Sequence, residues 1–146
     1  MALFVKKFGG SSVASPEKMR HIAERVLKDK KPEDRIVIVV SAMGDSTDGL
    51  LRLARQVSHR HYGREMDMLL TTGEQVSVAL MAMTFIEMGV PAVSMTGAQA
   101  GIQVSGCFGK ACIHTIHAER ISQTQGAAKI VSVAGTKGVT EQGEMT

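Results

Sequence analysis

The chain has 146 residues, of which 44% are hydrophobic and 21% are charged, as is typical of one globular domain with its own core. Its formal net charge is +3, from 17 Lys and Arg scattered among 14 Asp and Glu, and only 3% of its residues are aromatic. Scarce aromatic side chains and dispersed positive charge argue against nucleic acid as a partner, because single strands are bound on stacking platforms within basic grooves.

The first predicted strand begins at Leu3 and runs into the segment Lys7-Phe8-Gly9-Gly10-Ser11-Ser12. A helix is predicted from about Ser15 to Lys28, because Ser15 is a good N-cap and Pro16 suits the first helical position. A glycine turn between a strand and a helix start can hold a phosphate, since backbone N–H groups approach the anion closely and a lysine adds positive charge. The Walker pattern is absent, so an ordinary strand-to-helix turn is the alternative.

The next predicted strand, Arg35 to Ser41, is a β-branched run of the kind found where helices cover both faces of a sheet. Strand, helix and strand at this spacing predict a mainly parallel α/β sheet. We expect Ser41 to Asp48 to form a polar loop at the carboxyl end of this strand, where open α/β sheets bind ligands.

A helix is predicted from about Gly49 to His59, followed by a polar stretch, residues 60–64, and a long helix from about Glu65 to Met88. The second half of the long helix is apolar almost all round, which predicts a central buried helix ending at Gly89-Val90-Pro91. Its methionines are expected to fill the core; they are Met66, Met81, Met83 and Met88.

A short strand is predicted at Ala92 to Met95, and Gln99 to Ile116 reads as a hairpin. A short helix near Ala118 to Gln125 then leads into a strand, Lys129 to Ala134, and the chain ends in a turn-like stretch. The hairpin region contains four possible zinc ligands: Cys107, Cys112, His114 and His117. Because side chains alternate along a strand, these residues do not converge without a turn, and we expect no metal site.

No apolar segment with a cleavage site opens the chain, and its longest unbroken aliphatic run, Ile36 to Val40, is too short to span a bilayer. Two cysteines do not make a disulfide framework. We therefore expect a cytoplasmic protein without a membrane partner.

Four segments of this sequence resemble aspartate kinases, members of the amino-acid kinase family. In order, they are Lys7-Phe8-Gly9-Gly10-Ser11-Ser12-Val13, Val39-Val40-Ser41-Ala42-Met43-Gly44-Asp45-Ser46-Thr47-Asp48, Arg64-Glu65-Met66-Asp67-Met68-Leu69-Leu70-Thr71-Thr72-Gly73-Glu74 and Thr96-Gly97-Ala98-Gln99-Ala100-Gly101. The resemblance implies a three-layer α/β/α sandwich with a mainly parallel sheet. It also implies that residues 1–146 are the amino-terminal part of the kinase domain, without the nucleotide-holding carboxyl-terminal half and the ACT regulatory domains.

The activity implied by the resemblance is phosphorylation of the L-aspartate side chain by ATP, giving 4-phospho-L-aspartate for lysine, threonine and methionine biosynthesis. The nucleophile is a carboxylate that is already ionised at neutral pH, so the reaction needs positioning and charge neutralisation rather than a general base. Mg²⁺ would arrive with ATP, and no tightly bound cofactor is expected. The alternatives are another amino-acid kinase, such as acetylglutamate kinase, and a non-catalytic fragment that associates with a full-length kinase. The partners expected are aspartate, ATP and either a second copy or a full-length subunit.

The resemblance also assigns roles to residues. Lys7 is the expected catalytic residue, bridging the transferring phosphoryl group. The expected ATP-phosphate site comprises Lys7, Phe8, Gly9, Gly10, Ser11 and Ser41, with Ser12 as a further hydroxyl of the turn. Thr47 and Glu74 are expected to bind aspartate, the hydroxyl at a carboxylate and the glutamate at the ammonium group. Without the resemblance, Ser41 reads as a cap and Thr72-Gly73-Glu74 as the start of a helix.

One segment departs from the pattern of the family. Val133 to Val139 contains Thr136-Lys137 where aspartate kinases usually have Phe-Gln. The usual aromatic residue forms a wall of the substrate pocket, so its replacement bears on aspartate affinity. We interpret Lys137 as a solvated turn residue, with a phosphate contact as the alternative.

Overall fold

The computed structural model describes residues 2–60, 63–126 and 130–146. Four strands form a parallel sheet in the order β1-β2-β6-β3: β1 (Leu3–Phe8), β2 (Arg35–Val40), β6 (Ile130–Ala134) and β3 (Ala92–Met95). Two further strands, β4 (Ile102–Ser105) and β5 (Cys112–Ile116), form an antiparallel hairpin. The predicted parallel sheet and the predicted hairpin are both confirmed. Lys129, the predicted first residue of the last strand, lies outside the described residues.

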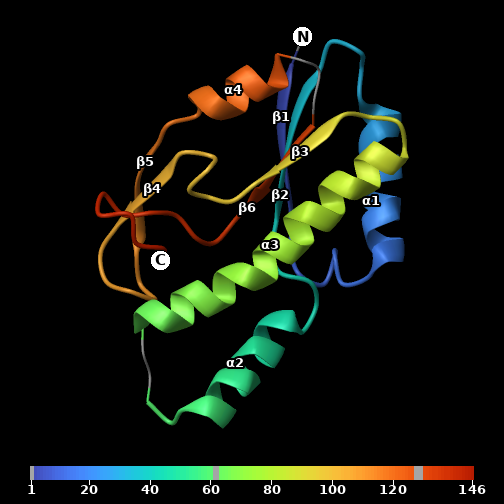
Figure 1. Cartoon of the computed structure of the whole chain (residues 1–146). Coiled ribbons are helices and arrows are strands. Elements are labelled where there is room, and N and C mark those ends of the chain that lie inside the picture. Colours follow the sequence, from blue (N-terminus) through green and yellow to red (C-terminus); the bar gives the residue numbers. More distant parts are fainter. Residues whose placement is uncertain (1, 61–62, 127–129) are drawn as a thin grey trace.

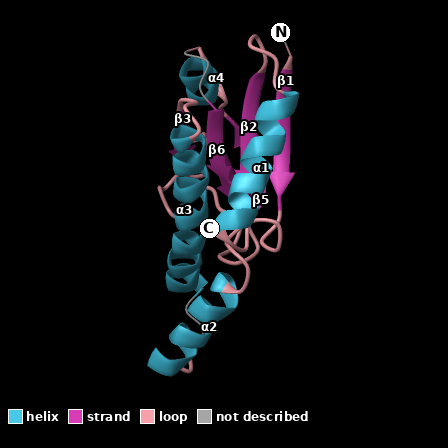
Figure 2. Ribbon diagram, turned by 90° about the vertical axis from the view of Figure 1, so that its right-hand side faces the viewer, coloured by secondary structure: helices cyan, strands magenta, loops and turns pink. Residues whose placement is uncertain are grey.

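Helices lie on both faces of the sheet (Figures 1 and 2). The helices are α1 (Pro16–Asp29), α2 (Ser46–Val57), α3 (Gly63–Glu87) and α4 (Glu119–Gln125). One core joins α1 and α3 to alternate residues of β2, among them Ile36, Ile38 and Val40. A second core, around Val37 and Val131, joins the opposite face to the hairpin region and to Ile121 of α4. The three-layer α/β arrangement is therefore confirmed.

The start of α1 follows from its sequence. The Ser15 side chain accepts a hydrogen bond from the Lys18 backbone N–H, and Pro16 occupies the first turn. Met19, Ile22, Ala23 and Val26 then face the sheet, at the spacing of one helix face. The predicted helix is confirmed to within one residue at each end.

Helix α2 begins three residues earlier than predicted, at Ser46. The expected loop Ser41 to Asp48 therefore ends at Asp45, and Thr47 lies in the first turn of α2. Asp48 also lies in that turn, where a carboxylate interacts favourably with the helix dipole. Polar residues that read as a loop thus form the beginning of a helix.

The prediction that the second half of α3 is buried all round is wrong. Val78, Met81, Ala82 and Phe85 are buried, whereas Val76, Met83 and Ile86 on the opposite side are more than half exposed. Of the predicted core methionines Met81 is buried and Met66 and Met88 are half-buried, but Met83 is 62% exposed. The sheet covers only one side of this helix, so an all-apolar sequence leaves one stripe facing solvent. The polar stretch predicted before α3 includes residues 61–62, which lie outside the described residues.

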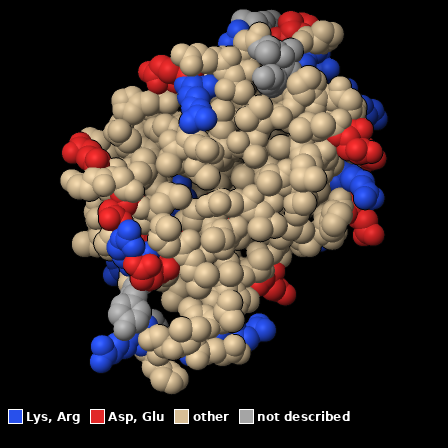
Figure 3. Space-filling model, viewed as in Figure 1, with Lys and Arg blue, Asp and Glu red and all other residues tan. Residues whose placement is uncertain are grey.

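Helix α3 is also the one described helix that is long and apolar enough to cross a membrane by length and composition. Its buried face carries Met81 and Phe85 against the sheet, and 44% of its apolar window is buried inside the protein. Charged side chains are scattered around the face seen in Figure 3 and form no continuous basic patch there.

Candidate functional site

A cavity of about 320 Å³ opens at the carboxyl ends of the strands, between the loop after β2 and the middle of α3. It is lined by Gly10, Ser41, Ala42, Gly44, Thr47, Leu70, Glu74, Thr136 and Lys137. Four of these residues were predicted from the sequence as site residues: Gly10, Ser41, Thr47 and Glu74. The structure brings these four together from three separate segments of the chain.

Close backbone approaches build this cavity. A Cβ atom added to Gly10 would lie 2.7 Å from the Ala42 carbonyl oxygen, so the turn after β1 and the loop after β2 meet only because residue 10 is glycine. The Gly44 N–H also donates to the Gly10 carbonyl oxygen at 3.0 Å. A Cβ atom on Gly73 would lie 3.3 Å from the Ala42 side chain, which lets α3 approach the same loop.

Ser41 ties β2 to α3. Its N–H donates to the Phe8 carbonyl oxygen at 3.2 Å, and its carbonyl oxygen accepts from the Ser77 hydroxyl at 2.8 Å. Ser77 is fully buried and lies one helical turn after Gly73. These bonds fix the height at which α3 crosses the end of the sheet, and so place Glu74 at the cavity.

Glu74 is a buried carboxylate, only 3% exposed. Its Oε2 atom accepts a hydrogen bond from the Thr136 backbone N–H at 3.1 Å. No salt bridge to Glu74 is formed within residues 2–60, 63–126 and 130–146. A buried carboxylate without a cationic partner is costly, which makes this position suited to a positively charged ligand group.

The remaining predicted residues lie elsewhere. Lys7 is exposed on β1, beside Val39 of β2, and it does not line the cavity. Gly9 and Ser11 are exposed in the turn after β1; the Gly9 carbonyl oxygen accepts from the Ser12 N–H at 3.0 Å. Phe8 packs against the α1 side of the core and lines a separate surface groove beside His21 and Arg25. The residues predicted to form one phosphate site are therefore divided in the structure. Gly10 and Ser41 line the cavity, and the other residues lie outside it.

Two lining residues with important contacts were not chosen from the sequence as site residues, Thr136 and Lys137. The interpretation of Lys137 as a solvated turn residue is wrong, because its side chain is only 15% exposed and its Nζ atom lies 2.5 Å from Asp67 Oδ1. Asp67, on α3, is itself 2% exposed. A lone aspartate within the run Met66 to Leu70 was the available sequence signal for this buried pair.

Hydrogen bonds control the ionisation of Asp67. Burial by itself raises the pKa of this carboxyl, but hydrogen bonds from Lys137, Thr146 and the Gly109 N–H outweigh burial and hold the pKa below its ordinary value. Asp67 is therefore a carboxylate at neutral pH, and it compensates the charge of Lys137.

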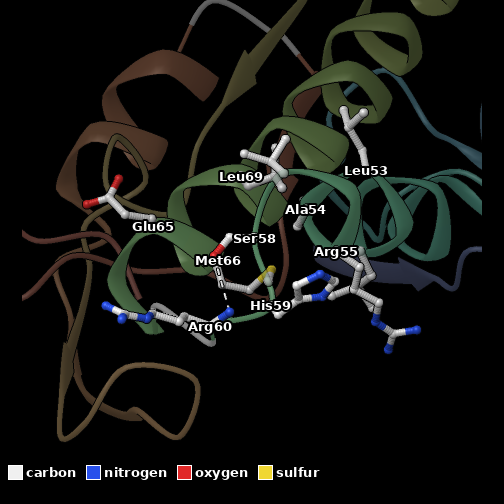
Figure 4. A pocket seen from close by; sticks show the side chains of 11 residues that line it. Leu53, Ala54, Arg55, Ser58, His59, Arg60, Glu65, Met66 and Leu69 are labelled. Atoms are coloured by element: carbon white, nitrogen blue, oxygen red, sulfur yellow. Dashed lines mark hydrogen bonds between the residues drawn. The ribbon is translucent and has the colours of Figure 1, made fainter.

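A larger cavity, about 570 Å³, lies between α2 and α3 (Figure 4). Its walls are mainly apolar, from Leu53, Ala54, Met66 and Leu69, with Arg55, His59 and Arg60 at its margin (Figure 4). None of the predicted site residues lines it. In the described residues, no group of three or more His, Cys, Asp or Glu is placed to hold a metal ion.

A parallel α/β sheet with a cavity beyond its strand ends and a buried carboxylate in the cavity wall is the arrangement in which open α/β folds commonly place small-ligand sites. A family model described as the amino acid kinase family matches residues 2–146. The chain belongs to the amino acid kinase family.

Individual relatives agree with this assignment. The chain is 51% identical over 146 residues to an aspartokinase from Bacillus sp. strain MGA3, covering all of this chain and 36% of that protein. The crystal structure of aspartate kinase from Synechocystis matches 99% of this chain and 23% of its own, with a TM-score of 0.78 and 40% identity.

E. coli aspartokinase III in complex with aspartate and ADP matches all of this chain and 43% of its own, with a TM-score of 0.74. At 18% identity, that likeness concerns the fold alone. The chain spans about a third of the length of the curated aspartokinases it matches.

Proposed function

We propose that this chain provides the aspartate-binding part of an aspartate kinase, which transfers the γ-phosphoryl group of ATP to the side-chain carboxylate of L-aspartate. The observation that carries the proposal is Glu74, a buried carboxylate without a salt bridge among the described residues, in a cavity at the carboxyl ends of the strands. The α-ammonium group of an amino acid is a cation of suitable size for this position. The relatives named aspartokinase support aspartate over acetylglutamate, whose amine is acylated and carries no charge.

Residues on either side of the cavity would then act on the two substrates. Glu74 binds the ammonium group of aspartate, and the Thr47 hydroxyl donates to one of its carboxylates. An oxygen of the aspartate side-chain carboxylate attacks the γ-phosphorus of ATP. The new O–P bond replaces the bond between the γ-phosphorus and the bridging β-phosphate oxygen, and ADP leaves. The attacking carboxylate is ionised at neutral pH, so no residue needs to remove a proton.

Phosphate binding is proposed for the turn after β1 and for the end of β2. Gly10 and Ser41 line the cavity, whereas Lys7 is exposed near the carboxyl end of β1, three residues before Gly10. Lys7, Phe8, Gly9, Gly10, Ser11 and Ser41 thus remain the proposed ATP-phosphate residues, with Lys7 as the catalytic one. Mg²⁺ would accompany the nucleotide and lower its charge.

A second candidate function is association with another subunit, either a second copy or a full-length kinase. The supporting observation is β1, an edge strand of the described sheet in which Leu3 is 62% and Val5 is 64% exposed. Apolar side chains on an unpaired strand favour pairing with another chain. We also propose a cytoplasmic location for the chain, in keeping with the small-molecule substrates proposed for it.

The proposed function is tested by calorimetric titration of the folded chain with Mg-ATP and then with L-aspartate. Lys7→Ala is expected to lower the affinity for the nucleotide by about tenfold or more, since a charge-assisted contact contributes roughly 1.5–3 kcal/mol. Lys6→Ala is the matched control, because Lys6 is the residue before Lys7 in β1 and its side chain points to the other face of the sheet. Equal loss of nucleotide affinity in both variants would contradict the role of Lys7.

A further inference from the structure

The Asp67 carboxylate accepts hydrogen bonds from three donors in two separate segments of the chain. Its Oδ1 atom pairs with Lys137 Nζ, and its Oδ2 atom accepts from the Gly109 N–H at 2.8 Å and from the Thr146 hydroxyl at 2.6 Å. One buried carboxylate on α3 therefore holds the hairpin loop and two points of the segment after β6. Three donors on two oxygens leave Asp67 little freedom to change its orientation.

Asp67 and Glu74 lie on the same face of α3. They are seven residues apart, close to two turns, or about 10 Å along the helix axis. Two consecutive residues of the facing segment bind them: the Thr136 N–H meets Glu74, and the Lys137 ammonium meets Asp67. The segment after β6 thus lies along α3 and is fixed at both carboxylates.

We infer that Asp67 and Lys137 are positioning residues for the cavity, whose ion pair holds the Thr136 N–H against Glu74. Thr136 and Lys137 are adjacent in the chain. Fixing the backbone position of Lys137 therefore restricts the Thr136 backbone to within a few ångströms. A Lys137 ammonium without a buried partner would move toward solvent, because an unpaired charge is costly inside a protein. The movement would withdraw the Thr136 N–H and leave Glu74 without that donor. The identity of the ligand at Glu74, though not the positioning itself, rests on the proposed function.

A second ion pair between the same two elements allows a matched control. Arg64 Nε of α3 bonds Glu144 Oε2 at 2.6 Å, and both side chains are well exposed. Exposed ion pairs contribute little, typically 0–1 kcal/mol. Arg64→Gln therefore removes a tie between α3 and the segment after β6 at a pair that does not include Asp67, and separates general attachment from positioning at the cavity.

The test measures amide hydrogen exchange at Thr136 by NMR, together with calorimetric affinity for L-aspartate, in the full chain. Lys137→Met removes both the charge and the donor, whereas Lys137→Gln keeps an N–H donor on a side chain one bond shorter. We expect Thr136 exchange to accelerate about tenfold or more in Lys137→Met, the equivalent of one lost hydrogen bond. Lys137→Gln is expected to lie between Lys137→Met and the unaltered chain, and Arg64→Gln within about twofold of the latter. Aspartate affinity should fall in the same order.

Unchanged Thr136 exchange in a folded Lys137→Met variant would overturn the inference, as would equal acceleration in Arg64→Gln. Should Lys137→Met not fold, Lys137→Gln decides the matter by the same comparison. The exchange measurement needs no ligand. An unaltered chain that binds no aspartate, while Thr136 still responds to Lys137→Met, would therefore contradict the proposed function and support the positioning role.

Discussion

At the scale of single residues, two buried carboxylates of α3 have different surroundings. Asp67 is paired with Lys137, so its charge is compensated within the protein. Glu74 has a backbone donor, the Thr136 N–H, but no salt bridge among the described residues. The first carboxylate is thus suited to holding structure together, and the second to binding a cation that arrives with a ligand.

The pairing of Asp67 predicts how stability depends on pH. Because the pKa of Asp67 is lowered in the folded protein, its stabilising effect is complete above the unfolded-state pKa of about 3.9 and is lost as pH falls toward the folded-state value. Asp67→Asn should cost on the order of 3 kcal/mol of unfolding free energy at pH 7, as expected for breaking a buried ion pair.

The difference between Asp67→Asn and the unaltered chain should shrink below about pH 4. Urea unfolding from pH 7 to pH 3 measures this. Glu87→Gln, which alters an exposed carboxylate at the end of the same helix, serves as the control. If the unfolding free energies of Asp67→Asn and of the unaltered chain differ by a constant amount down to pH 3, the assigned ionisation of Asp67 is contradicted.

At the scale of elements, the sequence predicted best those that rest on local signals. The Ser15 cap and Pro16 located α1, and the β-branched run located β2. The beginning of α2 was missed because Ser46, Thr47 and Asp48 suit both a loop and a first helical turn. The exposed side of α3 was missed because hydropathy does not say how much of a helix the sheet will cover.

The edge strand β1 predicts association. Leu3 and Val5 point to the same face of the sheet and are more than half exposed, and Phe4 on the other face is 44% exposed. We expect the chain to form dimers or larger species at micromolar concentration, and Leu3→Lys with Val5→Lys to shift it toward monomer. Sedimentation velocity measures this shift.

Val57→Lys is the control for a general effect of added charge, because Val57 is 83% exposed at the far end of α2. If this variant dissociates the chain as well as the β1 variants do, the interface does not lie at β1. A chain that is monomeric without any substitution would contradict the association altogether.

At the scale of the whole molecule, the candidate site depends on contacts between distant segments. Sequence motifs identified Gly10, Ser41, Thr47 and Glu74, and the fold places all four around one cavity. The pairing of Asp67 with Lys137 joins residues 70 positions apart, and no local pattern reveals such a contact. The division of the glycine turn into a cavity side and an outer side likewise follows only from how the turn packs on the loop after β2.

Glu74 is the residue proposed to bind the ammonium group of the ligand. Its most direct test is calorimetric titration of the chain and of Glu74→Gln with L-aspartate and with succinate, the same dicarboxylate without the amine. We predict that the unaltered chain prefers aspartate by about tenfold or more, as expected for a charge-assisted contact, and that Glu74→Gln loses this preference. Equal affinities of the unaltered chain for both ligands, or a preference that survives in Glu74→Gln, would contradict this role of Glu74.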